Sequence, residues 1–338
     1  MNLIPLLNKA VLRSLSESDA REAALALMSG DVSPAQVGGL LSAFRVRGES
    51  AGEILGFARA LREKAAAFPL ASDGLIDTCG TGGDGLGTFN VSTLAGIVAA
   101  AAGARVAKHG NRAASSRCGS ADLLETLGVR IDGPPALAAR CIEETGFGFL
   151  FAPHYHQTLR HLAPIRRELG FPSIFNLVGP LANPARVRFQ VMGVPTVAHM
   201  RPVAEALRSL GAEHAFVVHG EDGSDEISLV GPTSVLEVRP DGIEARTIGP
   251  QDAGLPTCRP EDLAGGEAAA NAEIATRILN GERSPAHDFV ILNAAAALMV
   301  AKRATSLREG AEMARDALLS FRARGVLEAL RRLSSEAV

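Results

Sequence analysis

Residues 77–93 read Asp77-Thr-Cys-Gly-Thr-Gly-Gly-Asp-Gly-Leu-Gly-Thr-Phe-Asn-Val-Ser-Thr93, and this stretch decides how the rest of the chain is interpreted. Five of the eight positions that start at Gly80 are glycine, and we call residues 80–87 the glycine loop. Glycine lets backbone N–H groups turn toward an anion without interference from a Cβ. An apolar run of helix formers follows Ser92, and a helix N-terminus attracts anions. The stretch therefore predicts a phosphate site.

A cationic segment follows the glycine loop. It reads Lys108-His-Gly-Asn-Arg112 and then Ser115-Ser-Arg-Cys-Gly-Ser-Ala-Asp122. Its lysine, arginines and serines are side chains that bind phosphate oxygens. A flexible surface loop would explain the glycines but not these cations, so phosphate is the ligand class that the two segments favour together.

Two standard nucleotide motifs fail on this sequence. Gly80-x-Gly-x-x-Gly85 has the spacing of the dinucleotide fingerprint, but that motif needs an acidic residue about 20 positions further on. The chain has Val106, Ala107 and Lys108 there. A P-loop needs Gly-Lys followed by Ser or Thr, whereas a leucine follows Gly85.

Length and composition limit the class of protein. The chain has 338 residues, 47% of them hydrophobic, which suits two domains. A net charge of −3 and a pI of about 6.3 argue against a nucleic-acid binder. The four scattered cysteines show no metal-binding spacing and favour a reducing compartment. Neither a signal peptide nor a membrane-length apolar run is visible, so we expect a cytoplasmic protein without membrane contact.

Residues 1–72 are expected to form a small all-helical N-terminal domain, because they carry helix signals and no strand signal. The first helix is predicted from an apolar face of Ile4, Leu7, Val11 and Leu15. The second is predicted to begin with a cap at Ser18 and to end at Gly30, and the third to begin with a cap at Ser33-Pro34 and to end at Gly48. The capping box Ser50-x-x-Glu53 is predicted to open a fourth helix through Leu61.

Residues 73–338 are expected to form a larger α/β domain with a mostly parallel central sheet flanked by helices, because short apolar runs alternate with helical segments. The expected strands are 75–78, 106–108, 147–151, 190–194 and 215–218. The carboxyl ends of parallel strands share one edge, where such sheets bind ligands. The Pro- and Gly-rich segment 172–184 is expected to connect the domains as a hinge candidate, and the segment near 170–190 to pack with the helical domain.

The motifs resemble those of the anthranilate phosphoribosyltransferase family of tryptophan biosynthesis, whose members are nucleoside phosphorylase-like in fold. The resemblance extends over nearly the whole chain. It rests on residues 80–93, 108–112 and 119–122 and on Phe151-Ala-Pro, Pro164-Ile-Arg-Arg-Glu-Leu-Gly170, Phe175-Asn-Leu-Val-Gly-Pro-Leu-Ala-Asn-Pro184 and Gly223-Ser-Asp-Glu-Ile-Ser228.

The resemblance implies a reaction. It implies Mg²⁺-dependent transfer of the 5-phosphoribosyl group from phosphoribosyl diphosphate to the amine of anthranilate, giving N-(5-phosphoribosyl)anthranilate and diphosphate, the second step from chorismate to tryptophan. It also implies a homodimer formed through the helical domain. Two alternatives stay open, a pyrimidine nucleoside phosphorylase-like enzyme and a non-catalytic relative that binds nucleic acid. The paired carboxylates Asp225 and Glu226 disfavour the first, and the acidic pI disfavours the second.

Site residues follow from the residues and the resemblance together. No acid–base catalyst is expected, and Lys108 is expected to stabilise the leaving diphosphate electrostatically. The residues expected to bind phosphoribosyl diphosphate are Gly80, Gly83, Asp84, Thr88, Asn90, Ser92, Thr93, Lys108, Gly110, Asn111, Arg112, Ser115, Ser116 and Ser120.

An acceptor that carries a carboxylate suits a guanidinium fork. The resemblance assigns this role to Arg166, with Asn111 as a second acceptor ligand and Gly80 beside them. His109 is expected to line the same pocket, whereas Arg167 is expected on a solvated helix face.

The adjacent carboxylates Asp225 and Glu226 would ordinarily be a solvated acidic turn. A diphosphate is normally bound as its Mg²⁺ complex, and Mg²⁺ takes one or two carboxylates together with phosphate oxygens. The resemblance implies that this pair, with the Ser92 hydroxyl, holds two Mg²⁺ ions. His154, His156 and His161 lack a matching carboxylate or cysteine and are not expected to bind metal.

Overall fold

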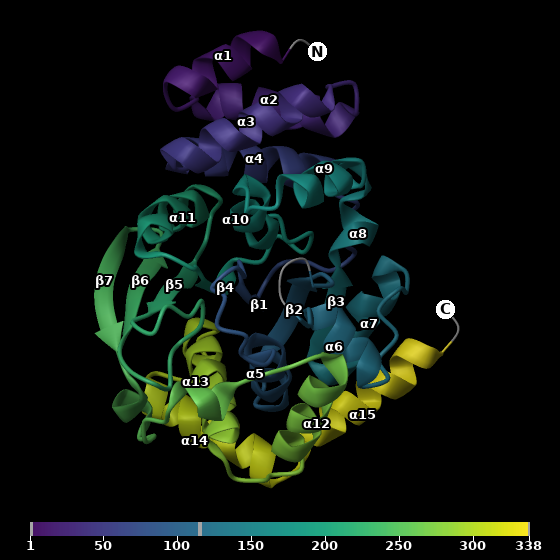
Figure 1. Ribbon diagram of the computed structural model, residues 1–338. Helices are drawn as coiled ribbons and strands as arrows, with labels where there is room; N and C mark the ends of the chain where they lie inside the picture. Colours follow the sequence, from purple (N-terminus) through teal and green to yellow (C-terminus); the bar gives the residue numbers. More distant parts are fainter. Residues whose placement is uncertain (1–2, 114–116, 337–338) are drawn as a thin grey trace.

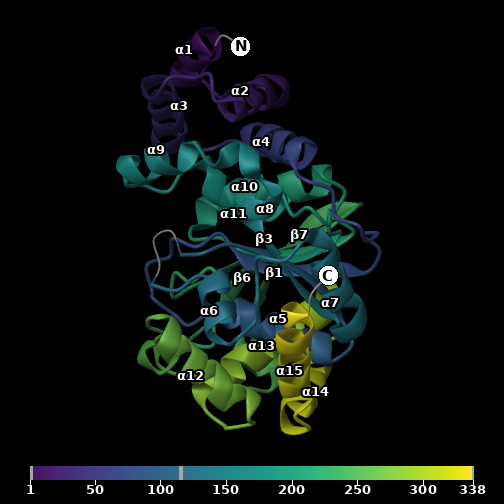
Figure 2. The ribbon, with the colours of Figure 1, turned by 90° about the vertical axis from the view of Figure 1, so that its right-hand side faces the viewer.

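The computed structural model describes residues 3–113 and 117–336. A layer of four helices lies above a seven-stranded sheet that has helices on both faces (Figure 1). In the second view the sheet lies between this helical layer and the C-terminal helices (Figure 2). The four helices are α1 (Ile4–Leu12), α2 (Glu17–Ser29), α3 (Pro34–Arg47) and α4 (Ala51–Lys64). The expected fold class is confirmed, while the division near residue 72 stays a prediction.

Two predicted helix starts have the expected capping bonds. The Ser33 hydroxyl accepts a hydrogen bond from the N–H of Gln36 at the start of α3. At the start of α4 the Ser50 hydroxyl accepts from the N–H of Glu53, whose carboxylate accepts from the N–H of Ser50. The buried Glu53 carboxylate also pairs with Arg47 at 2.6 Å, so the capping box joins α3 to α4.

Three details of the helical layer were predicted wrongly. Helix α1 ends at Leu12, and the side chains of Ile4 and Val11 are 50% and 63% exposed. The buried face is that of Leu6 and Ala10, because the apolar run offered two faces and the adjacent one packs on α3. Ser16 caps α2 in place of Ser18, and α4 continues three residues past Leu61.

The sheet has the order β3-β2-β1-β4-β5-β6-β7, and β1 to β5 pair in parallel. All five predicted strands are present. The strands are β1 (Leu75–Gly80), β2 (Arg105–Gly110), β3 (Phe147–Phe151), β4 (Phe189–Gly193), β5 (His214–Gly220), β6 (Thr233–Arg239) and β7 (Gly242–Ile248).

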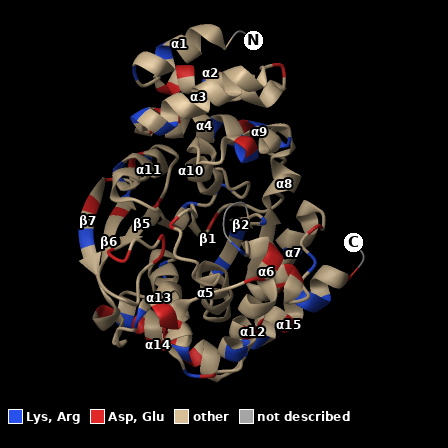
Figure 3. Cartoon of the chain, in the orientation of Figure 1, with Lys and Arg blue, Asp and Glu red and all other residues tan. Residues whose placement is uncertain are grey.

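The antiparallel strands β6 and β7 were not predicted from the sequence. They form a hairpin at the sheet edge, and β7 is largely solvent-exposed with charges of both signs, so it lacks an apolar pattern (Figure 3). Pro240-Asp-Gly242 between them is a turn signal that could have located the hairpin.

Alternate residues of the central strands face two separate cores. In β4, Phe189 and Val191 join the cluster that contains α5 (Val91–Ala101) and α13 (Pro285–Val300). Met192 and Val194 join the cluster that contains α1 to α4. This period of two is what a parallel strand covered on both faces requires.

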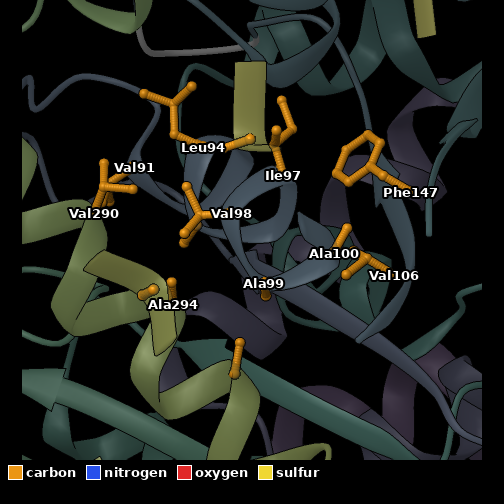
Figure 4. Packing of buried hydrophobic residues seen from close by; sticks show 14 of the residues in the cluster. Val91, Leu94, Ile97, Val98, Ala99, Ala100, Val106, Phe147, Val290 and Ala294 are labelled. Carbon is orange, nitrogen blue, oxygen red and sulfur yellow. The ribbon is translucent and has the colours of Figure 1, made fainter. Parts of the chain in front are cut away.

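Helix α5 is buried on nearly all sides, as an apolar helix at the centre of a domain must be. Figure 4 shows Leu94, Ile97 and Val98 of α5 among side chains of the sheet and of α13, including Val106 and Val290. This packing fixes the start of α5, and with it the end of the glycine loop.

The segment 172–184 was predicted to connect the domains as a hinge candidate, and in the structure it contains a packed helix. It contains α10 (Ile174–Leu181), whose Phe175 ring lies 5.7 Å from the ring of Phe57 in α4. Its prolines are accommodated because Pro180 lies in the last turn and Gln190 donates to the Pro180 carbonyl.

The remaining helices cover the two faces and edges of the sheet. No helix among the described residues has both the length and the apolar character needed to cross a membrane. These helices are α6 (Ser120–Thr126), α7 (Pro135–Thr145), α8 (Ala152–Tyr155), α9 (Leu162–Leu169), α11 (Val197–Ser209), α12 (Ala268–Leu279), α14 (Leu307–Leu319) and α15 (Arg322–Ser335).

Candidate active site

Four neighbouring strands end in glycine at the same edge of the sheet. The final residues of β2, β1, β4 and β5 are Gly110, Gly80, Gly193 and Gly220. A side chain at Gly80 or Gly193 would collide with Asp225, in the segment that follows β5. A side chain at Gly110 or Gly220 would collide with the segment that follows its own strand, so all four glycines allow close approach of the chain. The predicted phosphate and metal motifs all lie at this edge.

The glycine loop has a backbone that only glycine adopts easily. Gly82, Gly83, Gly85 and Gly87 all have positive φ, between 67° and 88°. The far end of the loop is held by a hydrogen bond from the N–H of Gly265 to the Gly87 carbonyl, 2.8 Å long. The conformation of the loop is therefore set by its glycines and by hydrogen bonds to segments outside it, including one from the Thr81 N–H to the Gly193 carbonyl at 3.0 Å.

The acidic pair lies directly against this loop. The Asp225 carboxylate accepts a 2.7 Å hydrogen bond from the N–H of Gly82. A Cβ placed on Gly80 would lie 2.3 Å from this carboxylate, and one on Gly193 would lie 1.5 Å from the Asp225 carbonyl oxygen. Two strand-end glycines therefore create the space that Asp225 occupies.

The carboxylates beside the glycine loop have little positive charge near them to offset their own. Burial, and then the neighbouring carboxylate of Asp84, raise the pKa of Asp225 to about 7. Burial and the charge of Asp225 raise the pKa of Glu226 well above its usual range, although Lys108 opposes this. One carboxylate oxygen of Asp84 is buried without a hydrogen-bond partner among the described residues. This donor set fits a hard cation, which would stabilise all three carboxylates.

No three His, Cys, Asp or Glu side chains of the described residues are already arranged as a metal-binding cluster. A cation bound here would take its remaining ligands from waters or from a bound anion, which is the usual situation of Mg²⁺ beside a diphosphate.

Lys108 lies between β1 and the start of α5. Its side chain is 2% exposed, and the ammonium group donates to the Thr78 carbonyl and, at 3.3 Å, to the Ser92 hydroxyl. The Thr78 hydroxyl donates to the Ser92 carbonyl at 2.9 Å. A buried cation is thereby held at a helix N-terminus, which makes the point strongly attractive to an anion.

His109, which is predicted to line the acceptor pocket, lies against helix α10. The His109 Nδ1 lies 3.1 Å from the Gly179 carbonyl, and its Nε2 is buried without a partner among the described residues. Burial, and then the adjacent His156, lower the pKa of His109 to about 3, so the ring is neutral near pH 7. The two imidazole rings lie edge to face, 5.2 Å apart.

Arg166 in α9 approaches the same helix. Its guanidinium donates to the Asn176 side chain at 3.2 Å and lies 5.3 Å from the Phe175 ring centre. Burial lowers its pKa, and no carboxylate of the described residues pairs with it. Asn176 and Gly179 are three residues apart and so share one face of α10. Arg166 and His109 therefore border the same helix face.

Eleven of the fourteen predicted diphosphate ligands lie at the strand-end edge or at the helix starts beside it. Gly80, Gly83, Asp84 and Thr88 lie in or beside the loop, Asn90, Ser92 and Thr93 lie at the start of α5, Lys108, Gly110 and Asn111 lie at the end of β2, and Ser120 begins α6. Arg112 instead pairs with Asp122 and Glu125 and lies over the Phe151 ring. Ser115 and Ser116 lie outside the described residues.

Sequence reasoning missed a buried pair that supports this site. The Asp77 carboxylate accepts from the N–H of His109 at 3.3 Å and from the Asn183 side chain at 2.8 Å. The same Asn183 amide donates to the Ala107 carbonyl. Burial raises the pKa of Asp77 to about 6, against the charge of Lys108. A lone aspartate within an apolar strand was the available signal.

A helical bundle followed by this α/β domain is the layout of a glycosyl transferase family. Its helical bundle domain matches residues 5–65 and its a/b domain matches residues 72–324. The anthranilate phosphoribosyltransferase of Rubrobacter xylanophilus is 52% identical over 321 residues, which cover 95% of this chain and 94% of that protein. The chain belongs to the anthranilate phosphoribosyltransferase family, as its motifs indicated, and is a phosphoribosyltransferase.

Solved structures of relatives agree over the whole chain. The Thermus thermophilus anthranilate phosphoribosyltransferase is 47% identical with a TM-score of 0.92, covering 98% of this chain and 99% of that one. The Saccharomyces cerevisiae enzyme in complex with PRPP (phosphoribosyl diphosphate) and Mg is 29% identical, with a TM-score of 0.89 and 99% of both chains covered. The yeast enzyme in complex with 4-fluoroanthranilate is 28% identical, with a TM-score of 0.86 and again 99% of both chains covered.

Proposed function

We propose that this enzyme transfers the 5-phosphoribosyl group from phosphoribosyl diphosphate to the amine of anthranilate, releasing diphosphate in the second step from chorismate to tryptophan. The observation that carries the proposal is the position of Asp225 and Glu226 against the glycine loop, with buried Lys108 beside them. The yeast relative bound to PRPP and Mg supports it. A diphosphate with its cations is the ligand that both the acidic and the basic groups accommodate.

The leaving diphosphate would lie on the loop N–H groups and the start of α5. The predicted ligands there include Gly83, Asn90, Ser92, Thr93 and Lys108, and each has an N–H, hydroxyl, amide or ammonium group that can bind an anion. The Lys108 charge strengthens its hold as negative charge grows on the diphosphate, which is how a fixed group stabilises a transition state.

Mg²⁺ fits the carboxylates of this site. Asp225 and Glu226 together with the Ser92 hydroxyl would hold two ions, which when bound supply positive charge that offsets the charge of the diphosphate. Asp84 is a third carboxylate beside this pair, and a cation held here would offset the repulsion between it and the diphosphate.

The acceptor would lie beside α10, between Arg166 and His109, with Asn111 and Gly80 completing its surroundings. The guanidinium without a counter-ion suits the anthranilate carboxylate. The aromatic amine is a nucleophile when neutral, so positioning carries more weight than a base. Because His109 is neutral, it adds no charge that would repel the positive sugar carbon formed as diphosphate departs.

The enzyme is proposed to act as a homodimer in the cytoplasm. Val11, Leu12 and Val46 of α1 and α3 are 63%, 84% and 89% exposed, and exposed apolar side chains grouped on neighbouring helices suit a protein contact. Nucleic acid and membranes are not proposed partners.

The test is loss of anthranilate fluorescence on addition of phosphoribosyl diphosphate, with and without Mg²⁺. The background is low, because the chain has no Trp and one Tyr. Mg²⁺-dependent loss that disappears in Asp225→Ala/Glu226→Ala supports the proposal. Glu221→Ala, an exposed carboxylate in the same turn, is the matched control and should keep activity. No loss of fluorescence, with phosphorolysis of pyrimidine nucleosides instead, would favour the phosphorylase alternative.

A further inference from the structure

A second polar cavity lies away from the glycine loop. It has a volume of about 340 Å³ and is enclosed by the end of α4, the connection 65–72 and the turn 183–186. Neither the loop residues 80–87 nor the acidic pair lines it. A ligand here would therefore not contact the glycine loop or the acidic pair, although Asn183 of the lining also binds Asp77.

Two arginines line this cavity without a counter-ion. Among the described residues, the Arg62 guanidinium donates to the carbonyls of Leu181 and Leu210 alone, at 2.7 and 3.5 Å. The side chain of Arg186 makes no hydrogen bond or ion pair with any described residue, although its backbone N–H is bonded within the turn. Burial, and then the charge of Arg186, lower the pKa of Arg62 to about 10, so the two guanidinium groups repel each other across the cavity.

The neighbouring charges are already paired. Glu63 is the acidic residue of the lining, and its carboxylate binds Arg21 and, at 3.3 Å, Lys64. Arg59 and Arg188 border an adjoining groove, where they pair with Glu17 and with Glu213, the latter at 3.0 Å. Of the four arginines in this region, Arg62 and Arg186 are therefore the two that have no carboxylate partner among the described residues.

The turn that carries Arg186 is held rigidly. Asn183 accepts from the N–H of Ala185 at 2.9 Å, and its carbonyl accepts from the N–H of Arg186 at the same distance. Arg186 adopts a φ of 48°, in the left-handed region that costs a side-chain-bearing residue free energy. Like-charge repulsion, the burial of Arg62 and the conformation of Arg186 all cost stability, and a bound oxyanion would offset the first two through guanidinium forks.

We propose that this cavity is a binding site for a small phosphate-class dianion, either inorganic phosphate or a phosphate monoester, held between Arg62 and Arg186. Its volume exceeds that of a phosphate ion, which leaves room for the organic part of an ester.

Crystals of the protein soaked in sodium selenate test the site, because the anomalous signal of selenium locates the anion directly. Wild-type protein should show a peak between Arg62 and Arg186. Arg186→Met should lose this peak. The variant should fold, because the Arg186 side chain makes no hydrogen bond or ion pair with the described residues. Arg188→Met, the matched control two residues away, should keep the peak. Absence of the peak from wild-type crystals, or its persistence in Arg186→Met, would overturn the proposal.

Back-soaks distinguish the two sources of the anion. Displacement of selenate by phosphate but not by glycerol 3-phosphate assigns the site to the free ion, and displacement by both assigns it to esters as well. In either case Arg186→Met should weaken phosphate binding at this position by about tenfold or more, as expected for loss of a charge-assisted hydrogen bond.

Discussion

Replacement of Gly193 by alanine tests whether the acidic pair depends on space left by the strand ends. The added Cβ would lie 1.5 Å from the Asp225 carbonyl oxygen and 2.3 Å from its carbon. Strand β4 cannot yield, because Gly193 is paired with Gly80 on one side and Val218 on the other. The segment that carries Asp225 must therefore move away by roughly 2 Å to restore normal contact.

Such a movement breaks the 2.7 Å hydrogen bond from the Gly82 N–H and withdraws the carboxylate from the loop. A misplacement of about 1 Å costs on the order of 10²-fold in rate, which corresponds to about 2.7 kcal/mol. We expect kcat/KM for phosphoribosyl diphosphate to fall by about this factor and the Mg²⁺ requirement to rise, with little change in the KM of anthranilate.

The assay is the fluorescence decay of anthranilate at varied phosphoribosyl diphosphate and Mg²⁺, with thermal melts to establish folding. Gly242→Ala is the control, because a Cβ there meets nothing within 4 Å. A folded Gly193→Ala enzyme with wild-type kcat/KM and Mg²⁺ dependence would falsify the argument that this glycine creates the space for Asp225.

Three further predictions concern the metal, the acceptor and the helical layer. Because the pKa of Asp225 is raised to about 7, protons compete with Mg²⁺ below that pH, so its apparent affinity should fall by up to about tenfold per pH unit on acidification in calorimetric titrations; an affinity that stays flat from pH 8 to pH 5.5 contradicts this. Arg166→Met should raise the KM of anthranilate by about 10- to 100-fold with the KM of phosphoribosyl diphosphate nearly unchanged in initial-rate kinetics, and equal effects on both would refute its place at the acceptor. Glu53→Ala should lower the free energy of unfolding by about 3–5 kcal/mol in urea titrations, because it leaves Arg47 and a helix start without their buried partner, whereas a loss below about 1 kcal/mol would place the pair among weak surface contacts.

The sequence was sufficient to predict the five parallel strands and to recognise the site motifs, because both depend on local patterns. Apolar runs beside helices identified all five parallel strands, and β3 matches its predicted bounds. The glycine loop could be recognised because positive φ at four of its positions demands glycine. Its position beside Asp225 follows from the rule that parallel strands present their carboxyl ends at one edge.

The rest depends on contacts between distant residues. Asn183 and Asp77 are 106 positions apart, and nothing in either local sequence states that they pair. The α1 face was misread because two overlapping apolar stripes satisfy the same periodicity and only packing on α3 selects one. Arg112 stays a predicted diphosphate ligand, and its pairing with Asp122 and Glu125 could not be read from its local sequence, because it is set by the fold of the segment after β2.

Helix α10 belongs to two systems at once. One side of it is part of the apolar interior of the N-terminal bundle, through Phe175 and Phe57, and the other borders the place proposed for the acceptor, through Gly179 and Asn176. A change in the packing of α10 should therefore alter both the thermal stability of the protein and its preference for the acceptor. Suppose that a laboratory selection for thermal stability repacks α4. The selected variants should change in their KM for anthranilate before they change in their KM for phosphoribosyl diphosphate, even though no selected position contacts either substrate.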